Sequence, residues 1–181
     1  MTKQTSRTPQ LPSQVESLLD AAAARYGVAP ELARAVAWTE SRGQQSAVGT
    51  SGERGVMQLM ADTAKRLGVD AADIVQNIDG GVRLLATNVK QYGHDAGLCA
   101  YNAGPKWASK APQAWPRTTQ DYIRKVKARE AVERELMQGD RTAAGPFTQE
   151  ATQPTAAESH GSSSRQSSPP PSRGKVSNDD T

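Results

Sequence analysis

The chain has 181 residues, of which 36% are hydrophobic and 23% are charged, and its formal net charge is +3. This length fits one domain, or two only if both are small, and the charge is too mild to indicate nucleic-acid binding. No apolar run is long enough for a transmembrane helix, and the single cysteine, Cys99, excludes an internal disulfide framework and a multi-cysteine zinc site.

The aromatic residues are concentrated in one part of the chain. Seven of the eight lie between Tyr26 and Tyr122. This distribution predicts a packed domain over residues 13–138. We expect a flexible lead over residues 1–12 and a disordered Ser/Pro-rich tail over residues 139–181, because neither segment has the apolar residues needed for a core.

Hydrophobic residues at helical spacing predict a mainly α domain. The expected helices cover residues 13–26, 30–42, 62–67, 77–92, 95–102 and 118–138. The expected residues at their starts are Ser13 (with Glu16 in a capping box), Pro30, Asp62, Asn77, Asp95 and Thr118 or Thr119. Glycines in residues 43–60 indicate a loop that could contain a short β element, and prolines in residues 105–117 indicate irregular chain.

An acidic residue continues the apolar stripe of the second helix. Ala33, Val36 and Ala37 lie at i, i+3 and i+4, and Glu40 takes the next position at i+7. Burial and the negative end of the helix dipole would both raise the pKa of Glu40, as a general acid requires. The alternative is a partly exposed carboxylate that pairs with Arg42 or another base.

Several short segments around and after Glu40 resemble the soluble lytic transglycosylase family. These segments, in chain order, are Glu40-Ser41, Gly55-Val56-Met57-Gln58 with Met60, Asn77-Ile78, Ala100-Tyr101-Asn102-Ala103-Gly104-Pro105 and Thr119 with Tyr122-Ile123. Each segment alone is a weak signal, but their order and spacing over about residues 14–130 make the resemblance specific.

The resemblance implies a lysozyme-like domain that cleaves the glycan strands of peptidoglycan without a cofactor or metal. Glu40 matches the single catalytic acid of the family. In that family the acid protonates the glycosidic oxygen between N-acetylmuramic acid and N-acetylglucosamine, and its carboxylate then accepts the proton of the muramic acid C6 hydroxyl. The C6 oxygen closes on C1, so the product is a 1,6-anhydro sugar.

The resemblance also implies a set of substrate-binding residues. They are Ser41, Gln58, Met60, Tyr101, Asn102 and Tyr122. The Gln58 amide suits an acetamido group, Met57 and Met60 offer apolar surface to a sugar or belong to the core, and Tyr101 either faces the substrate or packs inside.

Four positions depart from the family pattern. Gly49 stands where the family usually has Ser, with Thr50 or Ser51 as possible substitutes, and Glu53 stands where Ala is usual. Thr118 replaces a Glu, and Ala61 replaces a Pro. A second carboxylate at Glu53 could activate water for simple hydrolysis, or could form a surface ion pair with Arg54.

The remaining chemistry-bearing residues form no recognisable site. His94 and His160 are far apart and have no partners for a triad or a zinc site, and we expect His94 to be a surface cap. Cys99 is expected to be a buried small apolar residue. The basic residues 124–129 could contact an anionic polymer, or form a solvated face without nucleic-acid binding.

Two functional questions stay open at this level. The polar start of the chain has no apolar region typical of a secretory signal. We therefore expect a monomeric enzyme that acts on the cell wall and is delivered by a phage particle or a secretion apparatus. The termini of the chain could contact proteins of that particle or apparatus. The alternatives to a lytic transglycosylase are a muramidase-type hydrolase that uses Glu53 and a non-catalytic wall-binding or assembly module.

Overall fold

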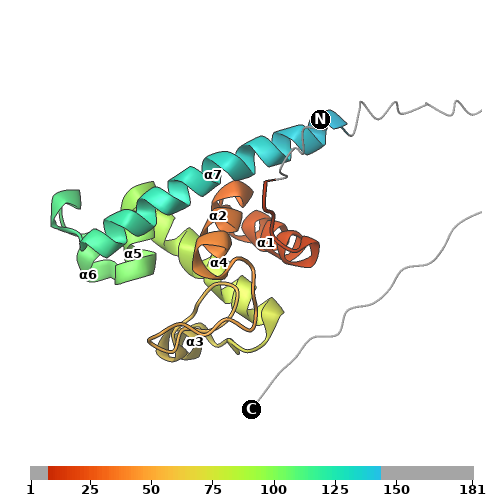
Figure 1. Cartoon of the computed structure of the whole chain (residues 1–181). Helices are drawn as coiled ribbons and strands as arrows, with labels where there is room; N and C mark the ends of the chain where they lie inside the picture. Colours follow the sequence, from red (N-terminus) through yellow and green to blue (C-terminus); the bar gives the residue numbers. More distant parts are fainter. Residues whose placement is uncertain (1–7, 144–181) are drawn as a thin grey trace, which may run out of the picture. The chain divides into compact units, whose positions relative to one another are not determined.

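The computed structural model describes residues 8–143, which form a helical domain (Figure 1). Its elements are α1 (Ser13–Tyr26), α2 (Pro30–Ser41), α3 (Ala61–Leu67), α4 (Ile74–Tyr92), α5 (His94–Ala103), α6 (Pro105–Ala108), a 3-10 helix η1 (Pro112–Ala114) and α7 (Arg117–Ala143). The predicted mainly α class is confirmed. Within the described part of the chain, no helix combines the length and apolar character that a bilayer span needs.

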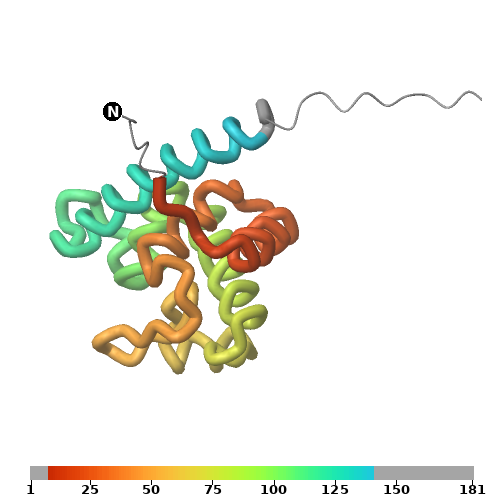
Figure 2. Tube along the Cα trace, turned by 45° about the vertical axis from the view of Figure 1, so that its right-hand side comes forward, coloured from red at the N-terminus to blue at the C-terminus, as the bar shows by residue number. Residues whose placement is uncertain are grey.

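Helix α2 lies inside the domain, packed between α1 on one side and α7 on the other. The long helix α7 crosses both α2 and α5, while α4 packs against α1 and α5 (Figure 1). In Figure 2 the loop between α2 and α3 lies at the opposite end of the domain from α7. The C-terminal end of α2 therefore lies between the long helix and the loop.

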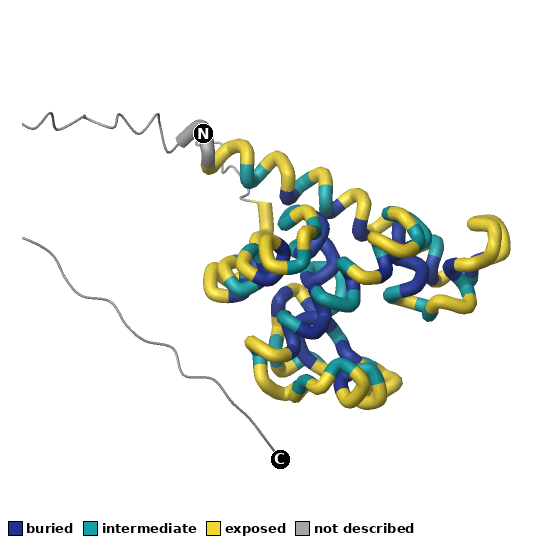
Figure 3. Tube along the Cα trace, turned by 180° about the vertical axis from the view of Figure 1, so that it is seen from behind, coloured by how far each residue is buried: buried dark blue, intermediate teal, exposed yellow. Residues whose placement is uncertain are grey.

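The core is built from the apolar faces of these helices. Its largest fully buried apolar side chains are Leu19, Met57, Ile78, Leu85, Leu98, Val36, Val56, Val82 and Val126. Figure 3 shows buried positions recurring along α7 between exposed ones, as expected for a surface helix with one apolar face. Residues from α1, α2, α4, α5, α7 and the loop thus share a single core.

The loop over residues 43–60 has two isolated antiparallel bridges, Val48 with Arg54 and Arg54 with Leu59, and no named strand. This matches the expected short β element. The buried side chain of Asn77 fastens the loop to α4. Its Oδ1 accepts from Met57 N at 2.8 Å, and its Nδ2 donates to Arg54 O at 2.8 Å.

Four predicted helix caps are wrong. Ser13, Asp62 and Asp95 lie within the first turns of α1, α3 and α5, and the residues before these helices make no side-chain cap bond. The N-cap of α4 is Asp73, whose carboxylate accepts from Gln76 N, so Asn77 lies inside the helix. Capping residues recur throughout the sequence, and local pattern alone does not show which of them tertiary packing leaves at a helix end.

The last helix differs from its prediction at both ends. It begins at Arg117, before Thr118, and runs beyond Gly139 to Ala143. The segment before it, expected to be irregular, contains α6 and η1, each with a proline in its first turn.

The final part of the predicted flexible lead is packed on the domain. Leu11 is buried, and Pro9 O accepts a hydrogen bond from Arg129 Nη1 on α7 at 2.9 Å. The flexible-lead prediction is wrong for this segment because Leu11 supplies an apolar side chain to the core. The predicted disorder of the tail falls on residues 144–181, which lie outside the described residues.

Candidate active site

Glu40 lies in the last turn of α2 and points toward the first turns of α7. Tyr122 on α7 donates a hydrogen bond from Oη to Glu40 Oε1 at 2.7 Å. Glu40 does not pair with Arg42, whose guanidinium stacks instead on Trp38. The structure therefore joins two predicted site residues that are 82 positions apart in the sequence.

The environment of Glu40 favours its protonated form. Burial is the largest influence, and together with the negative charge of Glu53 it raises the pKa of Glu40 to about 7. The hydrogen bond from Tyr122 acts in the opposite direction, since it stabilises the carboxylate. The predicted upward direction is confirmed. A carboxyl group with this pKa can donate a proton at neutral pH and then accept one.

Two tyrosines complete the surroundings of Glu40. Burial and the nearby Glu40 carboxyl raise the pKa values of Tyr101 and Tyr122 well above the usual tyrosine value, so both phenols stay protonated. Tyr101 Oη donates to Met57 O at 2.8 Å, which holds its ring between α5 and the loop. Both tyrosines therefore act near Glu40 as neutral hydrogen-bonding groups.

Ser41 is placed differently from its prediction. It is buried, its hydroxyl donates to Val56 O at 2.8 Å, and the same oxygen accepts from Gly43 N and Gln44 N at 3.1 Å each. The hydroxyl is thus fully used in fastening the loop to the end of α2. This geometry gives Ser41 a positioning role and leaves it no free group for a substrate.

Gln58 and Met60 lie in the second half of the loop. Gln58 adopts a left-handed backbone with φ 46°, which is uncommon for a residue other than glycine. Its Nε2 donates to Gly55 O at 2.9 Å and to Ala47 O at 3.2 Å, so its side chain is held against the loop. Met60 is 43% exposed, whereas Met57 is fully buried and belongs to the core.

Asn102 lies at the C-terminal end of α5 and is exposed. Its Oδ1 accepts a hydrogen bond at 2.9 Å from Thr119 Oγ1, and Thr119 is buried on α7. Thr119 was expected as a helix cap, and its role as the group that orients Asn102 was missed. Only the packing of α5 against α7 brings these two residues together.

The structure connects two of the departures from the family pattern. A side-chain carbon built at Gly49 would overlap Glu53 Oε2, and it would lie 2.9 Å from Gln58 Oε1. The carboxylate of Glu53 therefore occupies the space that a serine side chain at position 49 would need. Glu53 accepts from Ser51 N at 3.0 Å, and its charge contributes to the raised pKa of Glu40.

The other chemistry-bearing residues lie outside this site. Cys99 is buried, as predicted. His94 lies at the surface, as predicted, with its side chain 38% exposed, but it is the first residue of α5 and not its cap, which is Gly93. Its Nδ1 and Nε2 contact Asp95 at 2.8 Å and Glu130 at 2.9 Å. Arg129, expected on a solvated face, is buried against Glu133. No group of three metal-ligating side chains occurs within the described residues.

Comparisons with known proteins find relatives of this chain among transglycosylases. Residues 17–124 match the family model of the Transglycosylase SLT domain. A transglycosylase from Enterobacteria phage PRD1 is 41% identical over 110 residues, which cover 60% of this chain and 40% of that protein. The peptidoglycan transglycosylase gp16 of Escherichia phage T7 is 43% identical over 63 residues, covering 35% of this chain and 5% of that protein.

A solved structure shows the same fold. An inactive mutant of the lytic transglycosylase Slt from Pseudomonas aeruginosa superposes with a TM-score of 0.60 at 21% identity, covering 71% of this chain and 25% of that one. The chain thus spans less than half the length of these relatives. With the family match extending over more than half of its residues, the chain belongs to the Transglycosylase SLT domain family.

Proposed function

We propose that this protein is a lytic transglycosylase that cleaves the β-1,4 bond between N-acetylmuramic acid and N-acetylglucosamine in peptidoglycan. The observation that carries the proposal is the carboxyl group of Glu40, which accepts a hydrogen bond from Tyr122 and whose pKa burial raises to about 7. Family membership supports the reaction class, and the relative from phage T7, a peptidoglycan transglycosylase, supports peptidoglycan as the substrate.

One acid can serve both halves of this reaction. Glu40 donates its proton to the glycosidic oxygen, the bond from that oxygen to C1 breaks, and positive charge develops at C1. The Glu40 carboxylate then accepts the proton of the C6 hydroxyl while the C6 oxygen bonds to C1. The product ends in a 1,6-anhydro ring, no water is consumed, and Glu40 is protonated again.

The neighbouring residues fit roles around this acid. Tyr122 donates to the Glu40 carboxylate and would stabilise it between the two proton transfers. Asn102, Tyr101 and the free oxygen of the Gln58 amide are the polar groups proposed to contact the sugars. Met60 offers an exposed apolar side chain to a sugar face.

The test is mass spectrometry of the products formed from purified peptidoglycan. We expect anhydro-muramic ends, which are lighter by one water than the reducing ends of a hydrolase. Glu40→Gln should abolish these products, because Gln cannot transfer the proton. Products that persist in this variant would contradict the role of Glu40, and binding without any product from the native protein would indicate a wall-binding module.

A second candidate function is hydrolysis by Glu40 and Glu53 together. It is favoured by the Glu53 carboxylate, which fills the space beside Gly49 and raises the pKa of Glu40. In such a pair the protonated group acts as acid and the ionised group activates water, as in inverting glycosidases. Hydrolysis would give reducing ends, so the same product analysis separates the two functions.

The variant Glu53→Gln sharpens this comparison. A transglycosylase should keep forming anhydro ends after this change, whereas a hydrolase should lose its reducing ends. Gly49→Ser combined with Glu53→Ala is the matched control, since it restores the residue types that are usual in the family and leaves Glu40 untouched. Retained anhydro products in this control would show that the loop tolerates the exchange.

We propose that the protein acts at the cell wall and is delivered there by a phage particle or a secretion apparatus. Relatives from phages PRD1 and T7 support the phage route. Proteomic analysis of purified particles from the source tests it: the chain should be present in the particle fraction. Its presence only in secretion-apparatus fractions would favour the other route.

A further inference from the structure

Two acceptor groups converge beside Gly49 in the loop between α2 and α3. A side-chain carbon built on Gly49 would lie 2.2 Å from Glu53 Oε2 and 2.9 Å from Gln58 Oε1. Because both oxygens are close to this one point, they are at most about 5 Å apart, and a single nitrogen can donate to both. We call Glu53 and Gln58 together the two-acceptor site.

The oxygen of the Gln58 amide is held toward this point. Its Nε2 donates to Gly55 O at 2.9 Å and to Ala47 O at 3.2 Å, which uses both of its N–H groups. Its Oε1 accepts no hydrogen bond from the described residues, and the left-handed backbone of Gln58 (φ 46°) is a strain typical of positions that hold a ligand. The amide therefore offers a ligand an acceptor and no donor.

The carboxylate of Glu53 has no basic partner among the described residues. Its hydrogen bond comes from the backbone N of Ser51 at 3.0 Å, and the ion pair with Arg54 that the sequence allows is absent there. Glu53 and Gln58 are both partly exposed, so a ligand can reach their oxygens from solvent. The two-acceptor site therefore carries a negative charge that no neighbouring side chain balances.

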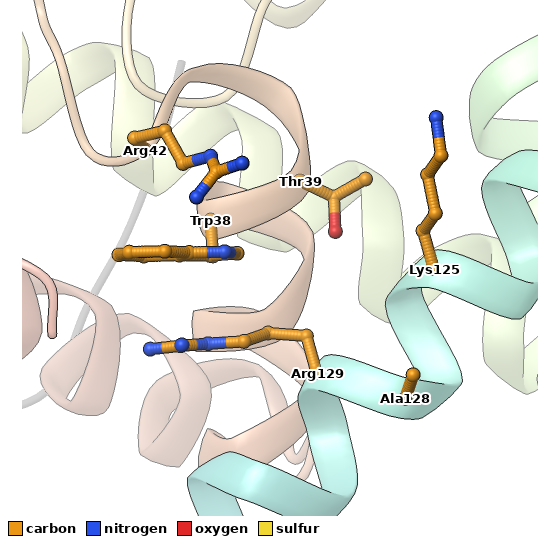
Figure 4. A pocket seen from close by; sticks show the side chains of 6 residues that line it. All are labelled: Trp38, Thr39, Arg42, Lys125, Ala128 and Arg129. Atoms are coloured by element: carbon orange, nitrogen blue, oxygen red, sulfur yellow. The ribbon is translucent and has the colours of Figure 1, made fainter. Parts of the chain in front are cut away.

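The basic residues near the end of α2 are engaged elsewhere. The Trp38 ring lies between two guanidinium groups, with Arg129 at 3.8 Å and Arg42 at 4.6 Å from its centre (Figure 4). Neither guanidinium forms an ion pair with Glu53, and Arg129 pairs instead with Glu133. The charge of the two-acceptor site is thus left for a ligand to neutralise.

The two-acceptor site lies near the carboxyl group of Glu40. The negative charge of Glu53 opposes the ionisation of Glu40, and partly exposed charges influence each other only within about 10 Å. Gln58 directly follows Met57, whose carbonyl oxygen accepts the hydrogen bond from Tyr101 at 2.8 Å. A glycan strand bound across Glu40 would therefore bring the substituents of a neighbouring sugar to Glu53 and Gln58.

The chemistry of this site selects a cation with several N–H groups. A carboxylate and an amide oxygen only accept hydrogen bonds, so the single N–H of an acetamido group satisfies one of them, whereas a primary ammonium group can satisfy both. The carboxylate also binds an ammonium group through a charge-assisted hydrogen bond. Each sugar of a peptidoglycan strand carries a nitrogen at C2, which is neutral when acetylated and cationic when the acetyl group is absent.

We propose that the two-acceptor site binds the free 2-amino group of a de-N-acetylated sugar next to the bond that is cleaved. The proposal rests on the proposed function for its polymer and makes Glu53 a residue that determines specificity. Gly49 and Glu53 then belong together, because the absence of a side chain at position 49 leaves the space that the carboxylate occupies. The enzyme prefers partly de-N-acetylated glycan over fully acetylated glycan.

The test compares two polymers from one source: glycan strands treated with a de-N-acetylase, and a portion of the same strands that is re-acetylated with acetic anhydride. An amidase first removes the peptide stems, so that every amine in the polymers belongs to a sugar. We expect the native protein to have a kcat/KM on the order of tenfold higher on the first polymer, and Glu53→Gln to bring this ratio close to one, since the charge-assisted bond is lost. A native ratio of one, or a ratio that Glu53→Gln leaves unchanged, would overturn the proposal.

Two further variants separate recognition from general effects of charge. The ratio is insensitive to the influence of Glu53 on Glu40, because that influence acts on both polymers alike. Asp62→Asn removes an exposed carboxylate from α3 as the matched control and should keep the native ratio. Gly49→Ser combined with Glu53→Ala removes the carboxylate in a second way and should also bring the ratio close to one. A preference that persists in this double variant, or that Asp62→Asn removes, would contradict the assignment to Glu53.

Binding measurements distinguish failure of this proposal from failure of the proposed function. Oligomers of glucosamine and of N-acetylglucosamine, matched in length, lack the bond that is proposed to be cleaved, so calorimetry with them needs no turnover. We expect the native protein to bind the glucosamine oligomer more tightly, although its net charge of +3 disfavours a polycation, and Glu53→Gln to lose this difference. Equal binding of the two oligomers by the native protein would refute the proposal and leave the proposed function intact. If the native protein cleaves neither polymer, the proposed function fails, and the calorimetric comparison still decides on the two-acceptor site.

Discussion

Replacing Glu40 by Gln should make the protein more stable at neutral and alkaline pH, although it removes the acid. The pKa of Glu40 is about 7 in the folded protein and close to the ordinary value of 4.5 in the unfolded chain. Between these values the folded state binds a proton that the unfolded state has lost. The free energy of unfolding therefore falls as the pH rises from 4.5 to 7, and the full penalty persists above pH 7.

The difference between the two pKa values corresponds to about 3 kcal/mol at most. Because the Glu40 side chain is partly exposed, solvent reduces this figure, and we expect about 2 kcal/mol at pH 8. Glutamine is neutral at every pH, and its side-chain oxygen can still accept the hydrogen bond from Tyr122. The free energy of unfolding of the variant, measured relative to that of the native protein, should thus increase from pH 4 to pH 8.

The assay is urea unfolding of both proteins at intervals between pH 4 and pH 8, with linear extrapolation to water. All other titrating groups are common to the two proteins, so the pH dependence of the difference reports Glu40 alone. A difference that is constant with pH would refute the reasoning. If the native protein instead became more stable relative to the variant as pH rises, the hydrogen bond from Tyr122 would affect the pKa of Glu40 more than burial does.

The other predictions concern residues around Glu40. Tyr122→Phe removes the hydrogen bond that lowers the pKa of Glu40, so the alkaline limb of the pH–rate profile should move to higher pH; an unchanged limb would contradict the bond's role. Ser41→Ala leaves Val56 O and two backbone N–H groups without their partner and should cost about 1–3 kcal/mol in urea unfolding. Asn77→Ala removes two bonds that fasten the loop and should cost about 2–4 kcal/mol; a cost below 1 kcal/mol would mean that water replaces them.

Local signals predicted most of the helices and failed at their ends. The apolar spacing in α2, α4 and α7 follows from the period of the helix and can be read without the fold. Where these helices end depends on whether a possible capping side chain bonds to the helix end or to another partner, as Asp95 and Thr119 show. Each is a good capping residue, yet Asp95 bonds to His94 and Lys127, and Thr119 bonds to Asn102. Lys127 and Asn102 each lie on another helix than the residue they bond to, so local pattern could not identify these two partners.

The sequence by itself determined the helical class, the family resemblance and the position of Glu40 on a buried stripe, because these depend on periodicity and on residue order. Tertiary structure decided the environment of that acid. Only folding places Tyr122 against Glu40 and the Glu53 carboxylate in the space beside Gly49. It also placed Arg129 of α7 against the Trp38 ring of α2, since contacts between α2 and α7 join residues that are more than 80 positions apart.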